Sequence, residues 1–223
     1  MAITNKILFL SDFDGTMSSS EFFLVYVDNY ARAENQILLA KTLAKEITSF
    51  DYLAGIFATP TLSNQTFLNH IEQFPLDKYV APTIQWLKDH HCDFKVVSAG
   101  ADAYIAPLLK RISTSPIEFF TNRAHFEGGT MIVKPAAEPF YGSYFGIDKS
   151  KVVRHLRNSY DTIIYAGDGS SDFEAALECD HIFAKSSLAR KLTEVSQEFH
   201  PFTDYSDILQ QLNEEKMFFS LDS

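Results

Sequence analysis

The sequence predicts an α/β fold, in which a Rossmann-like parallel sheet carries helices on both faces and a small helical domain follows the first strand. Short apolar runs alternate with segments of helical periodicity, which is typical of parallel β-α units. Several of these runs end in loops rich in Asp, Ser and Gly. Residues 18–79 are the exception, because their apolar residues recur at helical spacing without a clear strand.

Four apolar runs have the length and the boundaries of buried strands. They span residues 7–10, 93–97, 162–166 and 181–184. Helical patterns occupy residues 80–90, 103–111, 150–158 and 173–178. Two alternating segments around Gly128 and Gly129 predict a hairpin that forms a flap over about 123–134. Amphipathic helices at 186–199 and 206–212 are expected to close the fold.

The length of 223 residues and the hydrophobic fraction of 46% suffice for a core domain with a small insert. We expect residues 1–17 and 80–223 to form the core, and residues 18–79 to form a helical cap.

The composition restricts the partners and the cellular location. A net charge of -10 argues against nucleic acid and anionic membranes, which require a surplus of Lys and Arg. Cys92 and Cys179 show no paired spacing and are expected to be reduced. The N-terminal apolar run is too short for a signal peptide or a membrane span, so we expect a cytoplasmic protein. The oligomeric state is left open.

The loop after the first strand contains two carboxylates separated by one residue. Ligands bind at the carboxyl ends of the strands in open α/β sheets, so Asp12 and Asp14 can reach one site while Phe13 points into the core. Gly15 allows a sharp turn, and the Thr16 hydroxyl can donate to a phosphate oxygen or cap the next segment. A solvated turn is the alternative for this pair taken alone.

Two further loops add polar groups at the same edge. Ser98, with Ala99 and Gly100, offers a hydroxyl and backbone N–H groups at a helix start, although an N-cap serine fits equally well. Asp168 and Asp172 follow a later strand, and capping of the next helix is their alternative role. Converging carboxylates repel one another unless a hard divalent cation joins them, and Mg²⁺ suits ligands that are all oxygen.

A phosphate site also needs a fixed positive charge, for which Lys149 and Lys151 are the candidates. Lys149 shares a helix face with the apolar residues Val152, Val153 and Leu156. Lys151 is turned about 200° around the helix axis from Lys149 and should meet solvent. We therefore expect Lys149 to point into the site.

The order of these motifs resembles the haloacid dehalogenase superfamily. The matching segments are Asp-Phe-Asp-Gly-Thr (12–16), Val-Val-Ser-Ala-Gly (96–100), Lys149 and Gly-Asp-Gly-Ser-Ser-Asp (167–172). The insert is similar to the helical cap of the first type in that superfamily. The hairpin and the segment that begins at Lys149 are similar to the phosphoserine phosphatase-like branch, which includes the methionine-salvage phosphatase acting on 2-hydroxy-3-keto-5-methylthiopentenyl-1-phosphate.

The resemblance implies a role for each matched residue. Asp12 would be the nucleophile and Asp14 the general acid and then base, with Ser98 and Lys149 as phosphate ligands. Magnesium would be held by Asp12, the backbone carbonyl of Asp14 and Asp168, with Asp172 in support. The expected substrate-binding residues are Thr16, Glu21, Ser98, Ala99, Gly100, Lys149 and Ser171.

The implied function is a Mg²⁺-dependent phosphomonoester hydrolase for a small organic phosphate. Phosphoserine phosphatase and phosphotransferase are alternatives within the fold, and a catalytically silent domain that binds a phosphorylated ligand is an alternative of another class. A dehalogenase does not need the second carboxylate, so the presence of Asp14 argues against that activity. A phosphonatase needs a lysine in the cap that can form a Schiff base, and Lys41, Lys45 and Lys78 keep this alternative open.

The cap predicts the type of substrate. A buried substrate carboxylate would need a partner, preferably an arginine, and residues 33–110 contain none. Glu21 could instead form an ion pair with a substrate amine. We therefore expect an organic part that is neutral or carries an amine. Candidate inner residues, of which two or three should line the site, are Phe22, Phe23, Tyr26, Phe50, Tyr52, Phe57 and Phe67.

Overall fold

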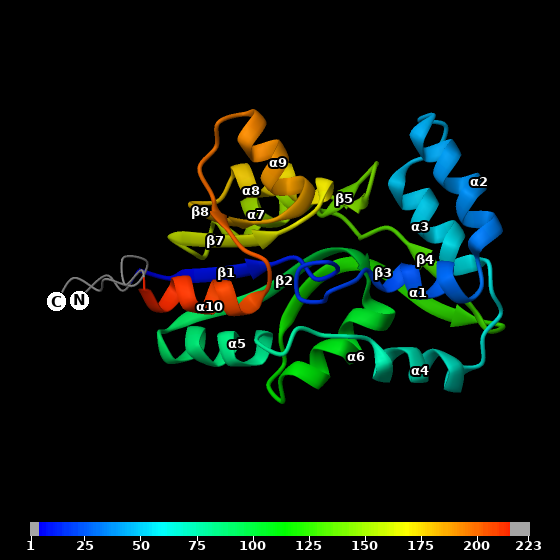
Figure 1. Ribbon diagram of the computed structural model, residues 1–223, viewed down its shortest axis with the longest axis horizontal. Coiled ribbons are helices and arrows are strands. Elements are labelled where there is room, and N and C mark those ends of the chain that lie inside the picture. The colour runs from blue at the N-terminus through cyan, green and yellow to red at the C-terminus, as the bar shows by residue number, and fades with distance from the viewer. Residues whose placement is uncertain (1–4, 215–223) are drawn as a thin grey trace.

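The computed structural model describes residues 5–214 and contains a central seven-stranded sheet (Figure 1). The strand order is β4-β3-β2-β1-β7-β8-β9, and every pairing except that of β3 with β4 is parallel. The strands are β1 (Ile7–Ser11), β2 (Cys92–Ala101), β3 (Glu118–Glu127), β4 (Thr130–Lys134), β7 (Thr162–Gly167), β8 (His181–Ala184) and β9 (His200–Pro201). A separate small ribbon pairs β5 (Tyr141–Gly142) with β6 (Gly146–Ile147). The predicted fold class is confirmed.

Helices cover both faces of the sheet (Figure 1). One face carries α5 (Val80–Asp89), α6 (Asp102–Ile112) and α10 (Tyr205–Glu214). The other carries α7 (Lys149–Leu156), α8 (Phe173–Leu177) and α9 (Ser186–Glu194). Successive residues of β1 belong alternately to the two apolar cores, since side chains of a strand point to opposite faces. This explains why β1 reads as an unbroken apolar run.

The segment between β1 and α5 folds into four helices. They are α1 (Phe22–Asn29), α2 (Arg32–Leu43), α3 (Ser49–Ala58) and α4 (Asn64–Gln73). A reciprocal capping box between Thr48 and Asp51 begins α3, and the Ser63 hydroxyl caps α4. Phe22 is the centre of an aromatic cluster that joins α1 to α3, α4 and α6. Its ring contacts Tyr26, Phe57, Phe67, Phe74 and Tyr104.

The hairpin expected over residues 123–134 is present, with its turn at Gly128 and Gly129, but its first strand is longer than expected. The first part of β3 pairs parallel with β2, and the second part pairs antiparallel with β4. The hairpin therefore continues the central sheet instead of standing apart from it. The loop between α3 and α4 and helix α4 contact the hairpin, since the Leu62 N–H donates to the Gly129 carbonyl at 2.7 Å and Phe67 packs on Phe126.

None of the helices within residues 5–214 combines the length and the apolar character needed to cross a bilayer.

Candidate active site

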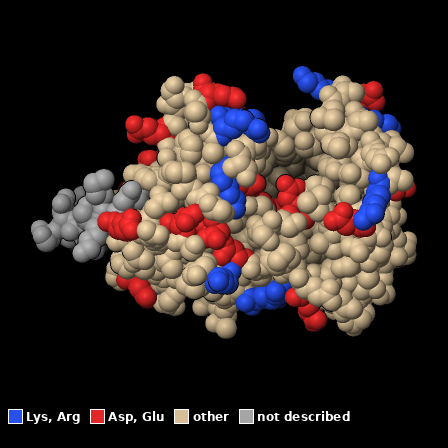
Figure 2. Space-filling model, viewed as in Figure 1, with Lys and Arg blue, Asp and Glu red and all other residues tan. Residues whose placement is uncertain are grey.

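A cavity of about 310 Å³ opens at the carboxyl ends of β1, β2 and β7, between the sheet and helices α1 and α3. Figure 2 shows this face hollowed between the α2–α3 part and the α7–α9 part, with acidic side chains in the hollow. The lining residues are Asp12, Asp14, Glu21, Phe23, Ser49, Tyr52, Leu53, Ser98, Ala99, Gly100, Tyr104, Phe145, Asp168, Gly169, Ser170 and Ser171. The three predicted motif loops thus meet in one place, and Lys149, the fourth motif, lies beneath the cavity and not on its wall.

The loop after β1 is held rigidly. The Asp12 N–H donates to the Ala166 carbonyl of β7 at 2.8 Å, and Phe13 is fully buried, as predicted. Gly15 has a φ of +76°, which favours glycine, and a Cβ there would lie 2.7 Å from the Asp168 Oδ2. Glycine at this position therefore lets the Asp168 carboxylate lie close to the loop that carries Asp12 and Asp14.

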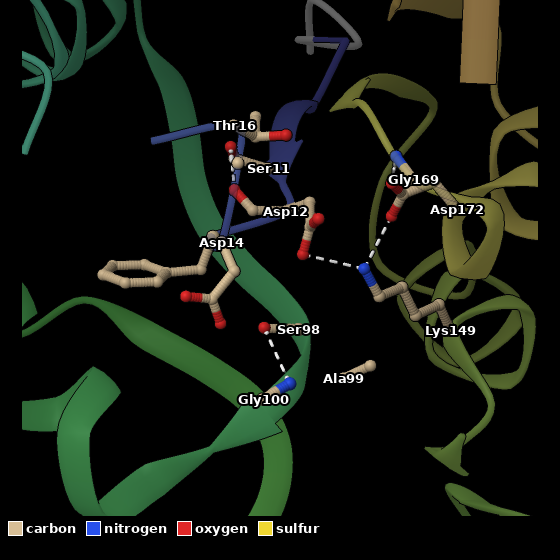
Figure 3. A network of polar contacts seen from close by, with 12 residues as sticks. Ser11, Asp12, Asp14, Thr16, Ser98, Ala99, Gly100, Lys149, Gly169 and Asp172 are labelled. Carbon is tan, nitrogen blue, oxygen red and sulfur yellow. Dashed lines mark hydrogen bonds and ion pairs between the residues drawn. The ribbon is translucent and has the colours of Figure 1, made fainter. Parts of the chain in front are cut away.

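Lys149 joins two carboxylates beneath the cavity (Figure 3). Its Nζ lies 2.7 Å from the Asp12 Oδ1 and 2.6 Å from the Asp172 Oδ1, and all three side chains are buried. Burial alone would lower the pKa of Lys149, but the two carboxylates outweigh it and raise the pKa above its usual value. Lys149 is therefore a permanent cation, and it points inward as the helix periodicity predicted.

Oxygen atoms of Asp12, Asp168 and Asp172 lie within 4.8 Å of one another. Burial and the nearby charge of Asp172 raise the pKa values of Asp12 and Asp168, because Lys149 does not compensate for all the negative charge. A divalent cation with oxygen ligands fits this donor set and would relieve the repulsion. Asp12 and Asp168 both line the cavity and are the residues best placed to bind one.

Asp172 has a different environment from the other two carboxylates. Its Oδ1 accepts from Lys149 and from the Tyr165 hydroxyl at 2.7 Å, and its Oδ2 accepts from the N–H groups of Asp168 and Gly169. Each oxygen already receives two donors. This arrangement suits a supporting role, in which Asp172 holds Lys149 and the Asp168 loop in place.

The expected substrate-binding residues divide into two groups. Glu21, Ser98, Ala99, Gly100 and Ser171 line the cavity. The Thr16 hydroxyl instead donates to the Asp168 Oδ1 at 2.7 Å, so it orients a carboxylate and does not face the cavity.

The surroundings of Ser98 differ from the prediction. Ser98 was expected at a helix start, but β2 continues through it to Ala101 and α6 begins at Asp102. The pairing of β2 with β3 is irregular after Val97 but resumes where Ala101 lies opposite Asn122, so the chain stays extended beyond the expected end. The Ser98 Oγ accepts the Gly100 N–H at 3.0 Å, which leaves its own proton free to donate into the cavity.

Two carboxyls on the cap side of the cavity carry raised pKa values. Burial raises the pKa of Asp14 to about 6, although hydrogen bonds from Tyr104 and the Phe22 N–H oppose the shift. Desolvation and then the charges of Asp14 and Asp168 raise the pKa of Glu21 to about 7. Each of these groups can therefore exchange a proton near neutral pH.

Sequence reasoning missed several residues of the site. Among the expected cap aromatics, Phe23 and Tyr52 line the cavity, in agreement with the predicted number of two or three. Tyr104, Tyr165 and Phe145 were not predicted. They lie within a helix, a strand and a loop between motifs, where an aromatic residue is an ordinary core residue, so no sequence signal distinguishes them.

Comparison with known proteins decides the family. The sequence model of the haloacid dehalogenase-like hydrolases matches residues 9–177. The chain belongs to this family. The region matched includes every residue of the site described above.

Two curated relatives of this hydrolase carry the name 2-hydroxy-3-keto-5-methylthiopentenyl-1-phosphate phosphatase. The protein from Bacillus cereus is 26% identical over 205 residues, covering 90% of this chain and 93% of the relative. The protein from Exiguobacterium sibiricum is 25% identical over 208 residues, covering 91% and 94%.

Solved structures support the fold. A substrate-bound phosphoserine phosphatase aligns with a TM-score of 0.70 and 17% identity, over 93% of this chain and 98% of that one. Phosphoserine phosphatase from T. onnurineus aligns with a TM-score of 0.67 and 20% identity, over 94% of each chain. Together these comparisons confirm the predicted family, the fold and the phosphatase class of activity.

Proposed function

We propose that this chain is a magnesium-dependent phosphomonoester hydrolase that acts on a small organic phosphate through an aspartyl-phosphate on Asp12. The observation that carries the proposal is the Asp12 carboxylate, which lies at the cavity beside Asp168 and is bound to the buried ammonium of Lys149. A carboxylate in this position can attack phosphorus and split one difficult displacement into two easier ones.

The residues of the cavity can be assigned to the two steps. An Asp12 oxygen attacks phosphorus, the ester bond breaks, and Asp14 gives its proton to the departing oxygen. Asp14 then takes a proton from water, whose oxygen attacks the aspartyl-phosphate and releases inorganic phosphate. Charge on the phosphoryl oxygens is stabilised by Lys149 and by the Ser98 hydroxyl. The substrate-binding roles of Ala99, Gly100 and Ser171 are part of this proposal.

For the metal we propose Mg²⁺, held by the side chains of Asp12 and Asp168 and by the Asp14 carbonyl, with Asp172 in support. When bound, the cation supplies positive charge to the phosphoryl oxygens. Thr16 and Asp172 keep Asp168 in place from its two sides.

Removal of divalent cations with EDTA should abolish phosphate release from 4-nitrophenyl phosphate. Added Mg²⁺ should restore it, whereas Ca²⁺ should not, because Ca²⁺ prefers more ligands at longer distances. The measurement is initial rate against free cation concentration after EDTA is removed. Full activity in the metal-free protein would contradict the site. A lack of turnover at every Mg²⁺ concentration would favour a silent phosphate-binding domain.

We propose further that residues 18–79 act as a cap on a core formed by 1–17 and 80–223, with the hairpin of about 123–134 in the core part. A cytoplasmic location is proposed as well, and the two free thiols support it because reducing compartments keep cysteines unpaired. The acidic net charge supports a small-molecule ligand in preference to nucleic acid.

The proposed substrate has an organic part without a carboxylate. Four carboxyls line the cavity, namely Asp12, Asp14, Glu21 and Asp168, and within the described residues neither lysine nor arginine lies on its wall. Apolar groups such as Phe23, Leu53 and Phe145 also line the cavity. A neutral or amine-bearing phosphate therefore fits better than a phosphorylated amino acid. The neutral enol phosphate named for the Bacillus cereus relative is a suitable first candidate.

O-phosphoserine should be a poor substrate. We expect its kcat/KM in Mg²⁺ to lie at least about tenfold below that of neutral or amine-bearing phosphomonoesters of similar size, because its carboxylate enters an acidic cavity without a partner. Phosphoethanolamine, which is phosphoserine without the carboxylate, is the matched comparison. A preference for phosphoserine of tenfold or more would show that this interpretation of the cap is wrong.

A further inference from the structure

The carboxyl of Asp14 is held from both sides of the cavity. Its Oδ2 accepts a hydrogen bond from the hydroxyl of Tyr104, which lies in α6 of the core and is buried. Its Oδ1 accepts the N–H of Phe22, the first residue of α1, at 2.8 Å. Each carboxylate oxygen therefore has one fixed donor and keeps a second lone pair for a proton, which it can pass to a substrate oxygen.

The two donors also contact each other. The rings of Tyr104 and Phe22 stack with centroids 4.3 Å apart and an interplanar angle of 10°. The side chain of Glu21, the residue before α1, makes no capping hydrogen bond, so Asp14 supplies the acceptor at the start of this helix. Asp14, Tyr104 and Phe22 thus form one packed unit across the boundary between α1 and the core.

Gly100 makes room for this unit. A Cβ at Gly100 would collide with the Tyr104 hydroxyl and would lie 2.7 Å from the Asp14 Oδ2. The glycine next to Ser98 and Ala99 is therefore required for the tyrosine to reach the carboxyl, in addition to any role in binding phosphate.

We propose that Tyr104 is a positioning residue for proton transfer, which fixes the carboxyl of Asp14 together with the amide of Phe22. Two hydrogen bonds to different oxygens prevent rotation of the carboxyl group. Its proton therefore keeps a fixed direction, toward the departing oxygen, as long as the Phe22 N–H is bound to Asp14. Proton transfer by a positioned side chain contributes about 10²–10⁴-fold to a rate, and this depends on close alignment. The inference rests on the proposed function and assigns Tyr104 a part in it.

The test uses two phosphate esters of similar size that differ in their need for a proton. Benzyl phosphate releases a strongly basic alkoxide, whereas 4-nitrophenyl phosphate releases a weakly basic phenolate that needs no proton. For each ester, kcat/KM reports the steps up to phosphoryl transfer onto Asp12.

Tyr104→Phe keeps the stacked ring and removes only the hydroxyl. We expect it to lower kcat/KM for benzyl phosphate by about 10- to 100-fold. For 4-nitrophenyl phosphate we expect a change within about threefold.

Tyr26→Phe is the matched control. Tyr26 is a buried tyrosine whose ring also contacts Phe22, and its hydroxyl has no hydrogen-bond partner among the described residues. This variant should leave both kcat/KM values within about twofold of wild type.

An Asp14→Asn background provides a second readout. There Tyr104→Phe should cause no further loss with benzyl phosphate, because the group that it positions is already absent. Equal losses on both esters, a persistent loss in the Asp14→Asn background, or no loss at all would overturn the proposal. Failure of the wild type to hydrolyse either ester would instead contradict the phosphatase function itself.

Discussion

Asp12→Asn should lower kcat by at least about 10³–10⁴-fold while leaving the fold intact, because it removes the nucleophile and one of the proposed metal ligands together. The folded state should tolerate the amide well. Burial and Asp172 raise the pKa of Asp12 even beside Lys149, so a neutral amide at this position avoids the cost of a buried negative charge. Lys149 retains its other partner, Asp172, at 2.6 Å.

Phosphate release in Mg²⁺ measures the loss of kcat, and a thermal unfolding curve tests whether the fold is intact. Acid quenching during turnover should trap a phosphorylated wild-type protein, and the variant should incorporate no phosphate. Asp28→Asn, at an exposed position of α1, makes the same change in charge and should be silent. Activity of the Asp12 variant within tenfold of wild type would refute the covalent mechanism.

Lys149→Ala should have the next largest effect, a loss of about 2–4 kcal/mol in transition-state stabilisation measured by kcat/KM. The Lys149 side chain is buried between Asp12 and Asp172, and no lysine or arginine of the described residues lines the cavity to take its place. Its removal also leaves the buried carboxylates of Asp12 and Asp172 without the positive charge that partly neutralises them. The variant should therefore unfold at a lower temperature in the absence of metal, and Mg²⁺ should recover part of that loss.

Lys151→Ala is the control for Lys149. Its ammonium donates to the Tyr141 carbonyl at the surface, away from the carboxylates. We expect kcat/KM within about twofold of wild type, since surface substitutions of this kind are usually nearly neutral. If the Lys151 variant lost activity and the Lys149 variant kept it, the assignment of the inward lysine would be wrong.

The sequence predicted most of the sheet and the motifs because each depends on local periodicity. The runs that became β1, β7 and β8 are mostly apolar, as is typical of strands covered on both faces. The positions of Val152, Val153 and Leu156 predicted that the face of α7 with Lys149 points inward. All of these residues are buried in the structure.

The first part of β3 was missed for a physical reason. Its first residues show no alternation of polarity, because Phe119 and Phe120 pack against opposite cores and the polar Asn122 is buried. The end of β2 was placed too early at Ser98, since the irregular pairing beyond Val97 has no distinct sequence pattern.

The residue types of the site, and the strand ends on which they lie, could be predicted from the sequence, because parallel strands bring their carboxyl ends to one edge. The contacts of each side chain depend on the tertiary structure. It turned the Thr16 hydroxyl to Asp168, satisfied both oxygens of Asp172, and placed the Tyr104 hydroxyl on Asp14. Such contacts join residues up to about 150 positions apart, and they depend on the packing of whole helices and loops, which local periodicity does not encode.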